Sequence, residues 1–162
     1  MTLEYYMTLQ QKHGCLFFKQ AGDSMEGFRG SESPWGNGIT PGTQVFLRFY
    51  VSAPNEVVLY VSTPDGKNLT IVRKVKRGTW NQNGSGVQMK RVTSLAQQYD
   101  DFDTGEYFLG SKWVNLQIAT FSTMTLWDSS KTGSRTTYPD ATIVKVNTIH
   151  QDYEEAVDID YR

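Results

Sequence analysis

The chain has 162 residues, 38% hydrophobic and 20% charged, which suits one domain with its own hydrophobic core. Sixteen Lys and Arg residues against seventeen Asp and Glu residues leave a net charge of -1. This balance excludes the strongly basic domain typical of proteins that bind nucleic acid or anionic membranes. No apolar run approaches the roughly 18 residues of a membrane-spanning helix, and the composition is not that of a disordered, collagenous or coiled-coil chain.

The N-terminal residues leave the location of the protein open. Residues 1–18 contain neither a basic n-region nor a small-residue cleavage site, so the chain is either not secreted or begins after a removed signal. Cys15 is the single cysteine and cannot form an internal disulfide. We expect it to be a small buried residue, since a catalytic thiol would need His13 or His150 as its base.

Short segments of alternating apolar and polar residues, separated by turn residues, dominate the sequence. In the segment 44–52, one face carries Val45, Leu47, Phe49 and Val51, and the other carries Phe46, Arg48 and Tyr50. The turn sequence Pro64–Lys67 joins the segments 56–63 and 68–76, which predicts a β-hairpin. Further strands are predicted at 86–93, 106–109, 112–119, 124–128, 141–150 and 156–161.

Helical signals are weak and are confined to residues 94–100, which could form one or two turns. The glycine-rich segment 21–42 is long and irregular, so we expect it to be functional, disordered or hiding a short strand. About nine to eleven short strands at this spacing predict an all-β protein. We predict that residues 1–162 form a single domain, a two-sheet antiparallel β-sandwich of jelly-roll type.

The segment 112–119 predicts a binding surface. Val114, Leu116 and Ile118 would form a core face, so that Trp113, Asn115 and Gln117 would project together from the opposite face. An indole ring can pack against the apolar face of a pyranose, and amides offer donors and acceptors to its hydroxyls. The alternative is that Trp113 is a core residue and that the amides are merely solvated.

Other aromatic and polar residues are candidates to flank this surface. Tyr50 and Arg48 lie on the non-core face of the segment 44–52, whereas Trp35 and Trp80 lie in loop-like sequence rich in Gly and Asn. A Trp in such a loop often serves recognition, and it can equally fold back over the core. We therefore predict that Tyr50, Arg48, Trp80 and Trp35 contact the same ligand as Trp113.

Acidic residues cluster around Gly105, and carboxylate oxygens beside a glycine turn suit Ca²⁺. The candidate calcium ligands are Asp101, Asp103, Glu106 and Asp158, although the twelve-residue EF-hand pattern is absent. The alternative is a solvated acidic turn. Asp158 and Asp160 alternate on the last predicted strand, so they would repel each other unless a cation or a basic side chain pairs with them.

The motifs of common enzymes are missing from the sequence, including nucleophile elbows, phosphate loops and zinc-binding helices. We therefore predict a protein without catalytic activity, although a small polysaccharide lyase stays an alternative. The basic run 73–77 is the one local basic patch, and its alternation along a strand indicates solvated charge instead of a nucleic-acid site.

Three segments resemble β-sandwich carbohydrate-binding modules. The run 40–51 resembles the segment in which a Pro-Gly turn leads into a strand that ends in an aromatic residue and Val. The run 112–116 resembles a later strand in which Trp precedes alternating apolar residues, and the run 156–161 resembles the final strand with Asp between apolar residues. Together these segments cover about a seventh of the chain.

The resemblance implies a non-catalytic, extracellular and monomeric module that is attached to a glycan-active enzyme and binds a plant or microbial polysaccharide. It also implies a structural Ca²⁺, and no nucleic-acid or membrane partner. The alternative from another class is a structural or assembly protein, such as a viral coat or fibre component, with no small ligand.

Overall fold

The chain forms two compact units, Met1–Val92 and Thr93–Arg162, which are described one after the other. The structure is a computed structural model. It describes residues 3–10, 13–20, 26–28, 34–35, 38–74, 80–87, 93, 95, 102–119, 123–131, 133–150 and 153–162. The prediction of a single domain stays a prediction.

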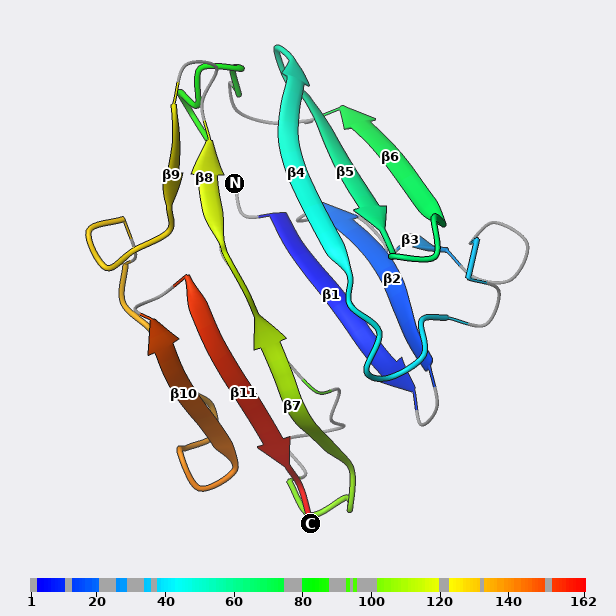
Figure 1. The fold of residues 1–162 in the computed structure, drawn as a ribbon, viewed down its shortest axis with the longest axis vertical. Helices are drawn as coiled ribbons and strands as arrows, with labels where there is room; N and C mark the ends of the chain where they lie inside the picture. Colours follow the sequence, from blue (N-terminus) through cyan, green and yellow to red (C-terminus); the bar gives the residue numbers. More distant parts are fainter. Residues whose placement is uncertain are drawn as a thin grey trace. The chain divides into compact units, whose positions relative to one another are not determined.

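The first unit contains two three-stranded antiparallel sheets in which consecutive strands are neighbours (Figure 1). The first sheet has the order β1-β2-β3, with β1 at Leu3–Gln10, β2 at His13–Gln20 and β3 at Glu26–Phe28. The second has the order β4-β5-β6, with β4 at Phe46–Ala53, β5 at Glu56–Ser62 and β6 at Asn68–Lys74. Strand β3 confirms that the irregular segment 21–42 hides a short strand.

Strands β4, β5 and β6 follow the predicted alternation with two exceptions: Leu47, on the core-side face of β4, is 40% exposed, and Val58, on the opposite face of β5, is 4% exposed. Val57, Leu59 and Val61 of β5 are buried, whereas Phe46 and Tyr50 of β4 are exposed. Phe46, Arg48 and Tyr50 pair across β5 with Ser62, Tyr60 and Val58, so all six side chains belong to one face. The predicted two-faced strand and the hairpin turn at Pro64–Lys67 are therefore confirmed.

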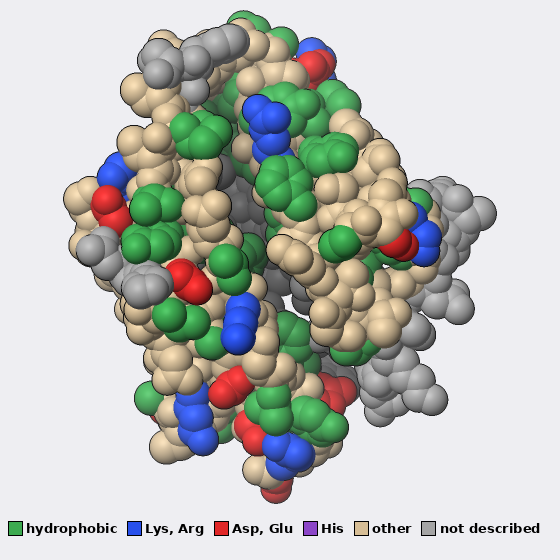
Figure 2. All heavy atoms as spheres, in the orientation of Figure 1, with side chains coloured by type: hydrophobic (Ala, Val, Ile, Leu, Met, Phe, Trp, Pro, Cys, Tyr) green, Lys and Arg blue, Asp and Glu red, His purple; other side chains and the backbone are tan. Residues whose placement is uncertain are grey.

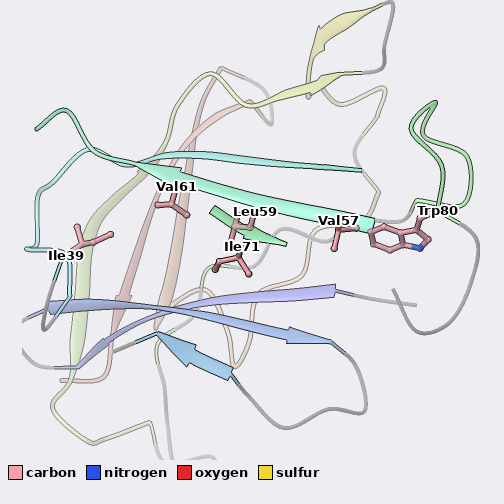
Figure 3. Packing of buried hydrophobic residues seen from close by; sticks show 6 residues of the cluster. All are labelled: Ile39, Val57, Leu59, Val61, Ile71 and Trp80. Atoms are coloured by element: carbon pink, nitrogen blue, oxygen red, sulfur yellow. The ribbon is translucent and has the colours of Figure 1, made fainter. Parts of the chain in front are cut away.

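The opposite face of this sheet carries the hydrophobic core of the first unit (Figure 3). Ile71 lies beside Leu59 on this face, and Ile39 and Trp80 cover its two ends. The backbone of Trp80 is fixed by a reciprocal contact with Asn55: the Trp80 amide donates to Asn55 Oδ1 at 2.8 Å, and the Asn55 amide donates to the Trp80 carbonyl at 2.8 Å. The Trp80 ring meets Phe49 edge-on, with ring centroids 6.1 Å apart.

The second unit contains a three-stranded antiparallel sheet and a two-stranded one (Figure 1). The larger sheet has the order β10-β11-β7, with β10 at Val144–His150, β11 at Glu154–Asp160 and β7 at Tyr107–Trp113. Strands β8 (Gln117–Ala119) and β9 (Met124–Leu126) form the smaller sheet. The core of this unit is formed by Leu95, Val144, Val157, Ile159 and Tyr161.

The predicted strand 112–119 is wrong as a continuous element. Strand β7 ends at Trp113, and β8 begins only at Gln117. Asn115 lies between them with a φ of 56°, in the left-handed region that Asn tolerates better than most residues. Val114, predicted to be in the core, is 60% exposed as a result.

The described residues contain strands and turns but no helix, so the all-β class with antiparallel sheets is confirmed. The predicted strand 86–93 and the possible helical turn 94–100 lie mostly outside the described residues. Within the described part of the chain, no helix is long and apolar enough to cross a membrane.

Trp80→Ala tests the core of the first unit. Trp80 is 2% exposed, so its removal leaves a cavity beside Phe49 and should lower the free energy of unfolding by about 3–5 kcal/mol. Phe46→Ala is the control, because Phe46 is 57% exposed and its loss removes mainly the edge-on contact with Tyr60, so it should change the same quantity by only about 0.5–1.5 kcal/mol. Urea unfolding followed by fluorescence measures both, and equal losses would contradict this assignment of the core.

Candidate functional site

Trp113 lies on the core side of its sheet, which corrects the prediction that it projects into solvent. Its cross-strand partner is Glu155, and the next pair on the same face is Ser111 with Val157, a core residue. The indole is half-buried, and its Nε1–H donates to Thr93 Oγ1 at 2.8 Å. Trp113 therefore cannot present its ring face on the outer surface of this sheet.

The neighbours of Trp113 form a polar contact inside the second unit. Glu155 is only 4% exposed, and its Oε2 accepts a hydrogen bond from Arg135 Nη2 at 2.7 Å. Arg135 Nη1 also donates to Thr148 Oγ1 at 3.0 Å, which links β10 and β11 through one guanidinium. A buried carboxylate needs such a partner, so we assign this group a structural role.

Asn115 and Gln117 are both exposed and remain together, because Gln117 Nε2 donates to Asn115 Oδ1 at 3.2 Å. The bend that carries them is fixed by backbone hydrogen bonds from Leu116 to Tyr153 and from Trp127 to Leu116. The break at Asn115 separates these amides from Trp113, so the predicted surface of one indole and two amides on one strand face does not form.

The structure instead brings aromatic residues together on the solvent-facing side of the β4-β5-β6 sheet. We call this surface the outer face. Three cross-strand rows form it, namely Phe46-Ser62-Asn68, Arg48-Tyr60-Thr70 and Tyr50-Val58-Val72. Figure 2 shows hydrophobic side chains gathered over this sheet with a basic side chain among them.

Ring contacts order the outer face. The Arg48 guanidinium carbon lies 5.0 Å from the centre of the Tyr50 ring, which is a cation–π distance. Phe46 meets Tyr60 edge-on, with centroids 6.3 Å apart. The predicted ligand contacts Arg48 and Tyr50 thus belong to one surface, to which the structure adds Phe46, Tyr60 and Val72.

Tyr60 and Val72 were missed as site residues although the sequence holds a signal for them. The hairpin turn at Pro64–Lys67 fixes the pairing of β5 with β6, and this register places Tyr60 and Val72 on the same face as Arg48 and Tyr50. Reading the two strands as a registered pair, instead of one at a time, would have placed them on the outer face.

Trp80 and Trp35 have different roles, although both lie in loop-like sequence. Trp80 is buried in the core, so its prediction as a ligand contact is wrong. Trp35 is half-buried and packs against the edge of the same core, and its Nε1–H donates to Thr63 Oγ1 at 3.0 Å. Of the two, only Trp35 reaches an open surface.

Trp35 lines a half-open hollow of about 340 Å³ at one end of the β4-β5-β6 sheet. We call it the Trp35 hollow. The Thr63 hydroxyl accepts from Trp35 and donates to Asp65 Oδ1 at 2.5 Å, while Asp65 Oδ2 lies 3.2 Å from Lys67 Nζ. The Thr63 hydroxyl, followed by Lys67, holds the pKa of Asp65 below its ordinary value, so this carboxylate is an ionised acceptor.

Three of the four predicted calcium ligands, Asp103, Glu106 and Asp158, lie among the described residues. Among the described residues no group of three or more His, Cys, Asp or Glu side chains is close enough to hold a metal. Asp158 Oδ1 accepts from the Gly110 amide at 2.7 Å, and the Glu106 carbonyl accepts from the Tyr161 amide at 2.8 Å. The Ca²⁺ site predicted at Asp101, Asp103, Glu106 and Asp158 stays a prediction, because Asp101 lies outside the described residues.

Basic side chains relieve the expected repulsion between Asp158 and Asp160. Lys145 is the cross-strand partner of Asp158, and Arg162 binds both oxygens of Asp160 at 2.7 and 2.8 Å. Arg162 also lies over the Tyr107 ring, 4.1 Å from its centre. This ion pair, with a smaller contribution from Lys145, lowers the pKa of Asp160 to about 2.

Comparison of the chain with protein-family models, curated proteins and solved structures finds no match. The candidate site therefore depends on the geometry of the outer face and of the Trp35 hollow.

The low pKa of Asp160 predicts an acid dependence of stability. The pKa of Asp160 falls from 3.8 to about 2 on folding, so the unfolded chain binds more protons between these two values. The stabilisation by the ion pair is therefore fully present above pH 3.8 and is lost as the pH falls towards 2. Asp160→Asn should abolish this part of the loss of stability between pH about 4 and 2, measured by thermal unfolding.

Arg162→Gln is the matched partner variant. It removes the same ion pair from the other side, so it should flatten the same pH window, and the double variant should add nothing further. A wild-type acid transition that both variants leave unchanged would contradict the assignment.

Proposed function

We propose that the chain is a non-catalytic module that binds a polysaccharide along the outer face of the β4-β5-β6 sheet. The observation that carries the proposal is the exposure of Phe46 and Tyr50 on one strand face, with Arg48 between them and Tyr60 beside them. This surface takes the place of the one predicted around Trp113.

The chemistry of the outer face suits a neutral, hydroxyl-rich ligand. Exposed rings such as Phe46 and Tyr50 provide flat apolar surface for the C–H face of a sugar. Arg48 offers several hydrogen-bond donors, and Asn68 and Thr70 offer both donors and acceptors to hydroxyls. Rings and orienting polar groups thus lie side by side in the first two cross-strand rows of the outer face.

The spacing of the rings favours a chain over a single sugar. Phe46 and Tyr50 are four residues apart on β4, about 13 Å at the usual rise of a strand. One pyranose cannot stack on both rings at this separation, whereas consecutive residues of a linear glycan can. Each contact is weak, so affinity depends on several acting together.

The other expectations from the resemblance belong to this proposal. They are the role as accessory module of a glycan-active enzyme, the extracellular location, the monomeric state and a structural Ca²⁺ that would require Asp101. A two-sheet sandwich of jelly-roll type is supported by the one-sided burial of the β4-β5-β6 and β10-β11-β7 sheets, because such sheets pack their apolar face against another layer.

The proposal is tested by affinity gel electrophoresis in the presence of glucans, mannans and xylans. The wild-type chain should be retarded by at least one of them, and Tyr50→Ala or Phe46→Ala should weaken binding about tenfold or more, as expected for a central aromatic contact. Neither substitution should unfold the protein, because both side chains are exposed.

Tyr107→Ala is the matched control. Tyr107 is as exposed as Phe46, and its ring contacts Arg162 much as the ring of Tyr50 contacts Arg48. It belongs to the β10-β11-β7 sheet, which does not carry the aromatic rows of the outer face. Its loss should leave retardation unchanged. Unchanged mobility of the wild-type chain across the whole panel would refute the proposal.

The second candidate function is assembly with further protein chains. Val72 of the outer face is 47% exposed, and Leu109, Met124 and Ile149 are also exposed apolar side chains. Strand β4 pairs only with β5 among the strands that the structure describes, so one of its edges has backbone groups that another strand could bind. Both features are typical of surfaces that bury themselves in an oligomer.

Light scattering separates the two functions. A polysaccharide-binding module should give the mass of one chain, whereas an assembly protein should give a defined oligomer that Val72→Lys disrupts by placing a charge in the interface. Val114→Lys, which places the same charge on an exposed valine outside the outer face, is the control and should leave the mass unchanged.

A further inference from the structure

Hydrogen bonds link the residues that line the Trp35 hollow. Thr63 is buried, and its hydroxyl is held between the Trp35 indole and the Asp65 carboxylate. The Thr63 amide also donates to the Lys67 carbonyl at 3.0 Å, which closes the turn between β5 and β6. These contacts fix Trp35, Asp65 and Lys67 before any ligand arrives, so binding would cost little ordering of the site.

The charges of the hollow favour a neutral ligand. Asp65 and Lys67 form an ion pair at 3.2 Å, so the wall carries no net charge to attract a phosphate or a cation. Thr40 and Thr43 add hydroxyl groups, and Trp35 and Ile39 add apolar surface. An ionised carboxylate, an ammonium group, hydroxyls and an indole in one hollow match the vicinal hydroxyls and C–H faces of a sugar.

The size of the hollow limits the ligand. Its volume of about 340 Å³ lies at the lower end of the roughly 300–1,000 Å³ found for small-molecule sites. This space suits one sugar residue and not an extended chain.

The hollow lies at the end of the sheet that carries the first cross-strand row of the outer face, on the side of the core residues Ile39 and Val61. Thr63 directly follows Ser62, which pairs with both Phe46 and Asn68 in the first cross-strand row. Thr43 precedes the start of β4 by three residues. A glycan that follows the outer face past Phe46 therefore comes to the turn that carries Asp65 and Lys67.

We propose that the Trp35 hollow binds the terminal residue of a neutral glycan, with Asp65 and Lys67 holding its hydroxyls and Trp35 contacting its ring. The inference rests on the proposed function for the class of ligand. It goes further in that the module would recognise the end of a glycan chain, whereas the outer face alone would bind any internal stretch.

Single sugars test the hollow separately from the outer face, because one residue cannot span the rings of Phe46 and Tyr50. The isotope-labelled chain is titrated with glucose, mannose, galactose and xylose up to about 50 mM, since Kd values near 1 mM are expected for one weak site. The indole N–H resonance of Trp35, assigned with Trp35→Phe, should shift and saturate with at least one sugar.

Asp65→Asn should lower the affinity for that sugar about tenfold or more, because a charge-assisted hydrogen bond to the sugar is lost. Asp128→Asn is the matched control. Asp128 also accepts from a turn hydroxyl, that of Ser130, and pairs with a lysine, Lys131, at 3.1 Å, but it does not line the Trp35 hollow. It should leave the titration unchanged.

The inference is overturned if no sugar saturates the Trp35 shift, if glycerol shifts the resonance equally, or if Asp65→Asn leaves the affinity unchanged. Saturation by a sugar in a chain that no polysaccharide retards would support the hollow and refute the outer face. Retardation by a polysaccharide without saturation by any single sugar would do the reverse.

Discussion

The burial of one complete face of β5 is the constraint from which the candidate site follows. Val57, Leu59 and Val61 are each at most 5% exposed, and they fix which side of the sheet faces the core. Because side chains on a strand alternate, a shift of one residue would move Tyr60 into the core and Val61 into water. The β4 partners Arg48, Tyr50 and Phe46 are therefore directed to the outer face by core packing, not by contacts of their own.

How far the sequence predicts the structure depends on how local the deciding contacts are. The two faces of β4 and the hairpin after β5 were predicted correctly, because alternation and a Pro-Asp-Gly turn are local signals. The face of Trp113 was predicted wrongly, because it depends on pairing with Glu155, far along the chain. Gly110, with a φ of 70°, lies at a β-bulge in β7, opposite the register shift between Val157 and Ile159. The extra residue places Tyr107 and Trp113 on opposite faces of the sheet, whereas regular alternation would place them on the same face.

The same bulge explains why Asp158 stands between apolar residues of β11. Gly110 has an amide that the ladder leaves for another acceptor, and the Asp158 carboxylate takes it at 2.7 Å. An aspartate between apolar residues of a strand therefore need not bind a ligand, because it can satisfy the backbone of a neighbouring strand. The positions of Trp80 and Trp35 are likewise set by contacts with residues far along the chain. Asn55 fixes the backbone of Trp80 over the core, whereas Thr63 holds only the indole N–H of Trp35. No sequence pattern distinguishes these two tryptophans.

Stability accounts for only part of the aromatic character of the outer face. The edge-on contact of Phe46 with Tyr60 is worth about 0.5–1.5 kcal/mol, and cross-strand pairs on an exposed face contribute about 0.2–1 kcal/mol. Such terms justify the half-buried Tyr60. They do not justify Phe46, which leaves most of its surface in water, when Thr at that position would favour the strand without exposing a ring. The exposed ring therefore supports our proposal that a ligand covers this face, and the polar side chains Asn68 and Thr70 beside it support a ligand with many hydroxyl groups.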